Sequence, residues 1–168
     1  MKIPTERVKE LRDQSGAGIM ECRNALIETE GDIEKATQIL KERSLFMAEK
    51  KKERTAAQGL VEAYIHTGGR IGALVELNCE TDFAAHTDEF KELAHNLSMQ
   101  VAAMNPQYIS QEDIPEGVDK NEAQADCLLL QPFIRDPDMT IQDIINETIY
   151  KVRENIQVNR IARFSLEE

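Results

Sequence analysis

Apolar residues in the first 45 positions recur at helical spacing, and glycines interrupt them. Val8 and Leu11 begin an apolar stripe, because residues three or four apart lie on the same face of a helix. Thr5 is a candidate N-cap for this helix. Gly16 and Gly18 end the stripe with a tight turn.

Two further short helices follow the glycine turn. Residues 19–29 form the second, with Ile19, Cys22, Leu26 and Ala25 expected to face inward. Gly31 stops this helix and Asp32 caps a third, whose inward residues are Ile33, Ala36, Ile39 and Leu40. The pattern predicts a three-helix bundle with a modest core. The charged residues 50–54 are predicted to form a solvated helical linker.

The hydrophobic period then changes from 3.6 to 2. In residues 60–66, Val61, Ala63 and Ile65 share one face of a strand. In residues 70–79 the shared face holds Ile71, Ala73, Val75, Leu77 and Cys79. Residues 67–69, Thr-Gly-Gly, supply the turn between them. This arrangement predicts a β-hairpin.

The second half of the chain returns to helical spacing. Residues 88–104 show the most regular helical pattern, with one side formed by Phe90, Leu93, Ala94, Leu97, Val101 and Met104. We expect a loop over 106–117, a helix over 118–130, a connection at Pro132 and Asp136-Pro137, and a helix capped by Thr140. That last helix runs to about Arg153, with Ile141, Ile144, Ile145, Ile149 and Val152 inward, and a third strand follows over 156–166.

These elements predict an α+β fold in two parts. Residues 1–55 form the three-helix bundle with its helical linker. Residues 56–168 form a core with a small three-stranded antiparallel sheet covered by helices.

The charge of the chain is uneven along its length. The net charge is −11. Residues 1–55 hold 12 Lys and Arg against 11 Asp and Glu, whereas the remainder holds 8 against 20. An acidic main body repels phosphate backbones, so we expect no direct nucleic-acid partner. The acidity either keeps the protein soluble or steers a partner.

Targeting and chemical signatures are sparse. No apolar run approaches 18 residues, so no membrane span is expected, and the charged start lacks the apolar region of a secretory signal. The three cysteines, Cys22, Cys79 and Cys127, are far apart and predict buried reduced thiols rather than a zinc site. His66, His86 and His95 predict no shared metal site, and no glycine-rich phosphate loop is present. We therefore expect neither a metal nor a cofactor.

Four segments in order resemble the elongation factor Ts family. The first two are LRDQSGAGIMECRNAL (11–26) and ELNCETDFAAH (76–86). The others are CLLLQPFIRD (127–136) and ENIQV (154–158). Together they span most of the chain, on the predicted background of helices followed by a hairpin.

The resemblance implies a nucleotide exchange factor for elongation factor Tu, the GTPase that delivers aminoacyl-tRNA, and not an enzyme. The partner would be bound in its GDP-bound and nucleotide-free forms. In the family the N-terminal bundle is ubiquitin-associated-like and docks on the partner's nucleotide domain. The Thr-Asp-Phe turn reaches toward the partner's helices beside the magnesium site. Carried onto this chain, the turn is Thr81, Asp82 and Phe83, and the docking candidates are Arg12, Ile19, Met20 and Arg23.

The chain departs from the family pattern at several positions. Ser15, Ile19, Arg23 and Ala84 stand where Thr, Met, Lys and Val are usual, and His86 stands where a basic residue is usual. Arg153 stands where Gly is usual before Glu-Asn-Ile. Residues 118–126 are much shorter than the helical region that most members have there, so the contribution of that projection is absent or reduced.

Phe83 has two interpretations. In one it wedges into the partner, while Asp82 either repels the phosphate side or accepts a backbone hydrogen bond. In the other, Phe83 covers the end of its own sheet and Asp82 caps the following helix.

Short relatives with a single small sheet are expected to pair, so we predict a symmetric homodimer. The family implies work in the bacterial cytoplasm or the plastid stroma. Two other functions are considered. One is a non-catalytic protein-interaction module with a ubiquitin-associated-like bundle. The other is an enzyme using Cys79, Glu80, Asp82 and His86.

Overall fold

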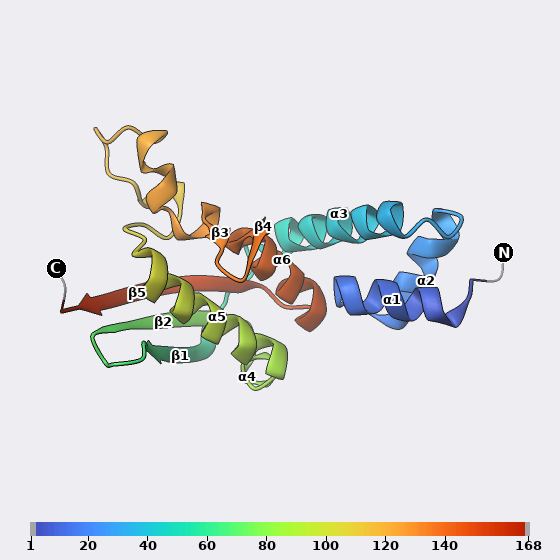
Figure 1. Ribbon diagram of the computed structural model, residues 1–168, viewed down its shortest axis with the longest axis horizontal. Coiled ribbons are helices and arrows are strands. Elements are labelled where there is room, and N and C mark those ends of the chain that lie inside the picture. Colours follow the sequence, from blue (N-terminus) through green and yellow to red (C-terminus); the bar gives the residue numbers. More distant parts are fainter. Residues whose placement is uncertain (1–2, 167–168) are drawn as a thin grey trace.

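The fold is α+β, with helices at one end and a small sheet at the other end of an elongated molecule (Figure 1). The computed structural model describes residues 3–166. The helices α1 (Thr5–Ser15), α2 (Ile19–Glu28) and α3 (Ile33–Lys51) form the N-terminal bundle. Its core holds Leu11, Cys22, Leu26, Ala36 and Leu40, at the helical spacing of the sequence.

Helix α3 is longer than predicted. It runs for 19 residues and includes Lys50 and Lys51 of the charged linker, whereas residues 52–54 lie beyond its end and are not helical as predicted. Its first half contributes Ala36 and Leu40 to the bundle, whereas Ala48 belongs to the core around the sheet. The cap of α1 also differs, because Pro4 precedes the helix without a side-chain cap and Thr5 is its first residue.

The main sheet is three-stranded and antiparallel, as the sequence predicts, and its strand order is β1-β2-β5. Its strands are β1 (Gln58–Ile65), β2 (Ile71–Cys79) and β5 (Ile156–Ser165). A register shift between Glu76 and Leu77, opposite Arg160 and Val158, breaks the alternation of β5. A bulge leaves one residue unpaired, and this explains the irregular pattern of the last strand.

One face of the sheet is covered and the other is open. Val75, Leu77 and Cys79 of β2 are fully buried against α5 (Asp88–Met104) and α6 (Ile141–Val152). Phe90 and Leu97 of α5 are likewise buried, whereas Met104, predicted to face inward, is exposed. The shared face of Val61 and Ile65 in β1 is the solvent-exposed one.

The helix predicted over 118–130 is wrong. That range holds two short 3₁₀ segments, η2 (Glu122–Asp126) and η3 (Leu128–Leu130), after a loop with η1 (Gln111–Asp113). Its buried residues face different neighbours: Ala123 and Cys127 pack with Ile114, and Leu128 joins the main core. Without one continuous apolar stripe, a helix has no face to bury.

Two smaller features complete the fold. The connection after Pro132 is a two-stranded hairpin, β3 (Pro132–Phe133) and β4 (Asp136–Thr140), which the sequence did not indicate. Thr140 caps α6 as predicted, accepting the Asp143 N–H at 3.2 Å. All three cysteines are buried and unpaired. Among residues 3–166, no helix combines the length and apolar character that crossing a membrane requires.

Candidate functional site

Phe83 projects into solvent from a short helix that follows the sheet. The helix α4 (Asp82–Ala85) is a single turn, in which Phe83 is 89% exposed while Ala84 and Ala85 are buried. The ring therefore does not cover the end of its own sheet. Thr81, rather than Asp82, caps α4, because its Oγ1 accepts the Ala84 N–H at 3.4 Å. Asp82 is exposed, and its carbonyl contacts His86 Nδ1 at 2.7 Å.

The turn before Phe83 is anchored from the far end of the chain. The Thr81 N–H donates to one oxygen of Glu154 at 2.9 Å, and the Thr81 hydroxyl donates to the other at 2.5 Å. The Cys79 thiol donates to the Thr81 carbonyl at 3.1 Å. Two charge-assisted bonds and a buried strand end hold the base of the exposed ring in place.

Cys79 has the properties of a structural thiol. It is fully buried, and burial together with the negative charge of Glu154 raises its pKa to about 11. The thiolate is the reactive form of cysteine, so Cys79 is a poor nucleophile. Glu80 instead accepts the Asn155 N–H at 2.7 Å, and Asp82 and His86 are exposed. The arrangement does not favour the enzyme built from these four residues.

A shallow hollow lies beside Phe83. It measures about 390 Å³ and lies between α4, the start of α5 and the end of α6. Its lining residues are Phe83, Ala84, Thr87, Glu89, Lys151, Val152 and Glu154. A projecting ring beside a hollow is a shape that a partner's helix surface can fit.

The bundle exposes two adjacent apolar side chains at the start of α2. Ile19 is 56% exposed and Met20 is 58% exposed. The predicted inward orientation of Ile19 is wrong. It is the first residue of α2, after the extended Gly18, and the buried stripe of the helix begins at Cys22. Large apolar residues side by side in water suit a protein contact.

The remaining docking candidates lie nearby in sequence and at the surface. Arg12 is exposed in the last turn of α1, and Arg23 is exposed in α2. Between them, Gly16 takes a left-handed φ of 64°. The side chain of Lys151 from α6 lies against Gly16 so closely that a Cβ there would meet its Cε at 2.3 Å. The turn between α1 and α2 is thus seated on the end of α6.

Sequence reasoning missed a polar cluster where the bundle meets α6. Arg153 pairs with Glu21 of α2, and its guanidinium lies 4.5 Å from the centre of the Tyr150 ring. Burial alone would raise the pKa of Glu21, but hydrogen bonds from Arg153, Tyr150 and the Gly18 N–H lower it. Burial and the hydrogen bond to Glu21 raise the pKa of Tyr150 to about 12. The available signal was an arginine where the resemblance has glycine.

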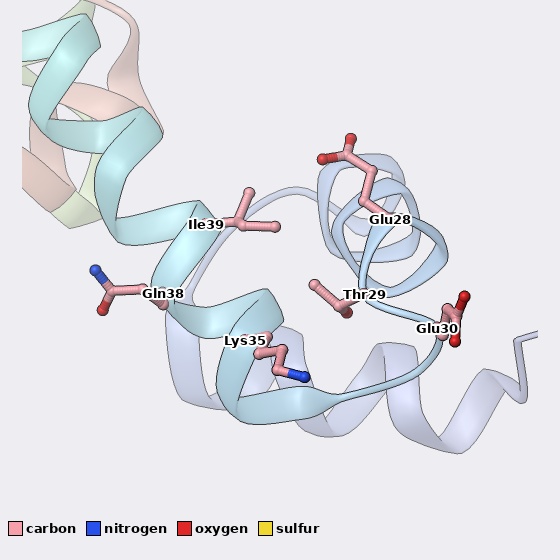
Figure 2. A pocket seen from close by; sticks show the side chains of 6 residues that line it. All are labelled: Glu28, Thr29, Glu30, Lys35, Gln38 and Ile39. Atoms are coloured by element: carbon pink, nitrogen blue, oxygen red, sulfur yellow. The ribbon is translucent and has the colours of Figure 1, made fainter.

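The rest of the described chain offers no built ligand site. Across residues 3–166, no three His, Cys, Asp or Glu side chains gather as metal ligands would. A second hollow, of about 450 Å³, is lined by the end of α2, the connection after it and the first turns of α3. Figure 2 shows the side chains that line it. Lys35 at its edge pairs with Asp32, the N-cap of α3, at 3.2 Å. Since this charge is used within the bundle, we assign the hollow no ligand.

Comparison with known proteins identifies the family. A family model described as elongation factor TS matches residues 22–126, more than half of the chain. Elongation factor Ts of Caldanaerobacter subterraneus is 50% identical, with 96% of each chain covered. The chain belongs to the elongation factor Ts family. It is therefore a translation elongation factor by descent, as the four sequence segments indicate.

Other family members resemble the chain to a similar degree. Elongation factor Ts of Carboxydothermus hydrogenoformans is 47% identical, with 99% of this chain and 90% of the relative covered. For elongation factor Ts of Coprothermobacter proteolyticus the identity is 45%, with all of both chains covered. That alignment has 197 positions against 168 residues here, so at least 29 positions are absent from this chain. The chain is a shortened member of its family.

Proposed function

We propose that the chain releases GDP from elongation factor Tu by inserting Phe83 beside the partner's magnesium and phosphate site. The observation that supports this most directly is the exposure of Phe83 on an anchored turn. An exposed aromatic ring contributes little to the stability of the free protein. Buried in a partner's pocket it contributes ~2–4 kcal/mol on the usual scale for interface anchors.

The mechanism requires shape rather than chemistry on this chain. Nucleotide in a GTPase is held by Mg²⁺ and by backbone donors around the phosphates. Mg²⁺ demands near-ideal octahedral geometry, so a small displacement of the groups around it weakens nucleotide binding steeply. Phe83 wedges apart the helices that carry those groups. Asp82, exposed beside it, acts on the same region by charge or by hydrogen bonding.

Linkage makes the nucleotide and the factor weaken each other's binding to the GTPase. If the factor weakens GDP binding, GDP weakens binding of the factor by the same ratio. The factor therefore binds the GDP-bound and nucleotide-free forms in turn, and incoming GTP displaces it. The bundle supplies a second contact, on the partner's nucleotide domain, through Arg12, Ile19, Met20 and Arg23. Since the relatives compared are bacterial, we place this activity in the bacterial cytoplasm.

The direct test uses elongation factor Tu loaded with a fluorescent GDP analogue. We expect the full chain to accelerate dye release in a saturable manner, and excess GDP to compete with the chain for the GTPase. Binding without acceleration would refute exchange activity and favour a simple protein-interaction module. Acceleration of dye release without any binding of the chain to the GTPase would refute the wedge.

We further propose that the protein acts as a symmetric homodimer joined through the open face of the sheet. The exposed face carries apolar residues on all three strands, beside the Glu76–Arg160 ion pair: Val61, Ala63, Ile65, Leu74, Ala162 and Phe164. Val61, Ile65 and Phe164 are each more than 60% exposed. A second copy seated on this face would cover it symmetrically, as expected for closed pairs.

Leu74→Glu tests the dimer, because Leu74 lies on the central strand of the open face. We expect the parent to sediment at twice the mass of the chain and the variant at the mass of a single chain. Val118→Glu is the control, since Val118 is similarly exposed but lies in the loop after η1. A monomeric parent, or a Leu74→Glu variant that remains dimeric, would refute this interface.

A further inference from the structure

The segment from Arg153 to Asn155 bonds to α2, to the connection between α3 and β1, and to the turn before Phe83. Arg153 pairs with Glu21, the residue next to Met20 in α2. Glu154 holds Thr81, two residues before Phe83. Asn155 bonds to the connection between α3 and β1, and its N–H donates to Glu80, which follows β2. Three consecutive residues thus bind the bundle, the linker and the turn.

Arg153 is held on more than one side. Its Nη1 lies 3.3 Å from Met47 Sδ of α3, and its carbonyl accepts Lys51 Nζ at 2.6 Å. It ends α6 with a left-handed φ of 64°. A non-glycine residue in this conformation is strained. Glycine would therefore suit the backbone at this position better than arginine does.

Asn155 closes the junction from within. It is 2% exposed, and its side-chain amide donates to the carbonyls of Lys52 and Arg54 at 3.3 and 2.7 Å. The backbone N–H of Asn155 donates to the Glu80 carboxylate, and Glu80 Oε1 lies 3.7 Å from Arg54 Nη1. The linker is therefore fixed to the segment rather than free to bend.

We propose that Arg153 and Glu154 are positioning residues that fix the bundle and the Phe83 turn at the spacing at which both engage one GTPase. This rests on the proposed function. Two contacts on one rigid body raise each other's effective concentration, and loosening the connection removes that advantage. Arg153 sets the orientation of α2 and Glu154 sets that of the turn. Arg153 acts through Glu21, and Glu154 acts through Thr81, the residues to which they are bonded.

Two substitutions at one position separate positioning from stability. Arg153→Gly and Arg153→Gln both remove the pair with Glu21, but only Gly relieves the left-handed backbone. We expect Arg153→Gly to melt at a higher temperature than Arg153→Gln. Both should raise the concentration of factor that half-saturates GDP release by roughly fivefold to tenfold, at the lower end of coupling between sites. The maximal rate should change little.

Glu154→Gln tests the other contact. A Gln side chain keeps one acceptor for Thr81 where Glu154 offers two. We expect a maximal release rate about fivefold lower, with a smaller change in the half-saturating concentration. Arg43→Gln is the control, because Arg43 pairs with Glu28 inside the bundle at 2.7 Å and leaves the junction intact. It should leave both exchange parameters unchanged.

A partner-free measurement distinguishes this inference from the proposed function. Spin labels at Asn24→Cys in α2 and Glu92→Cys in α5 report the distance between bundle and core. The three native cysteines are buried, so labels attach at the introduced sites. We expect a wider distance distribution in Arg153→Gly than in the parent. Equal widths, or equal half-saturating concentrations in parent and both Arg153 variants, would overturn the inference. A parent without exchange activity would overturn the proposed function.

Discussion

Replacing Phe83 with Ala is expected to abolish most of the acceleration of GDP release while leaving the fold intact. The ring is 89% exposed in the free protein, so its removal creates no cavity and changes the free energy of unfolding by no more than ~0.5 kcal/mol. In the complex, loss of a buried aromatic anchor costs ~2–4 kcal/mol. That is roughly a 30- to 700-fold loss, measured as the rate of fluorescent GDP release at a fixed concentration of factor.

Phe46→Ala is the matched control for this experiment. Phe46 is also an exposed phenylalanine, 64% exposed on α3, where Lys50 lies 4.9 Å from the centre of its ring. It makes the same chemical change away from the Thr81–Phe83 turn, and it should leave exchange near the parent rate. If Phe83→Ala retains parental exchange, the wedge mechanism is wrong, even though the chain remains a family member.

The sequence predicted the regular elements well where one period ran over many residues. The bounds of α5 agree with the predicted range 88–104, because its apolar residues recur at helical spacing along one face. The hairpin of β1 and β2 was equally clear from its period of 2 and its glycine turn. Local pattern sufficed wherever one element buried one continuous stripe.

Prediction failed where neighbouring residues serve different parts of the structure. Residues 118–130 contain leucines and alanines that favour helix, yet Ala123 and Leu128 belong to separate clusters. The open face of β1 could not be recognised either, since Val61 and Ile65 are as apolar as a core-facing pair. Which face of a strand is covered depends on where α5 packs, and that is a tertiary choice.

The candidate site was likewise predicted only in part from the sequence. The resemblance pointed to Phe83 as an exposed contact, and the structure places it at the surface. The residues that hold the turn, Glu154 and Cys79, were not predicted as its support. Glu154 lies 73 positions from Thr81, so no local pattern relates them. Contacts that fix a site from distant segments become visible only once the chain is folded.

Phe90 provides the opposite case to Phe83, seven positions away. It is fully buried in the core under the sheet, beside Leu93 and Leu97 of α5. Phe90→Ala removes most of a ring from a packed interior, and such changes cost ~3–5 kcal/mol, partly as lost transfer energy and partly as a cavity. Since domains of this size have ~5–15 kcal/mol in total, the loss is a large share of stability.

We therefore expect Phe90→Ala to lower the midpoint of thermal unfolding by roughly 6–20 °C, using the usual shift of ~2–4 °C per kcal/mol for chains of this length. Circular dichroism measures the midpoint, and GDP release is compared at 10 °C, where the variant is still folded. There the molecules should retain near-parental exchange, because Phe90 is fully buried and presents no surface to a partner. A variant that melts like the parent would contradict the packing of α5 on the sheet. A folded variant as inactive as Phe83→Ala would show that the core, and not the exposed ring alone, takes part in exchange.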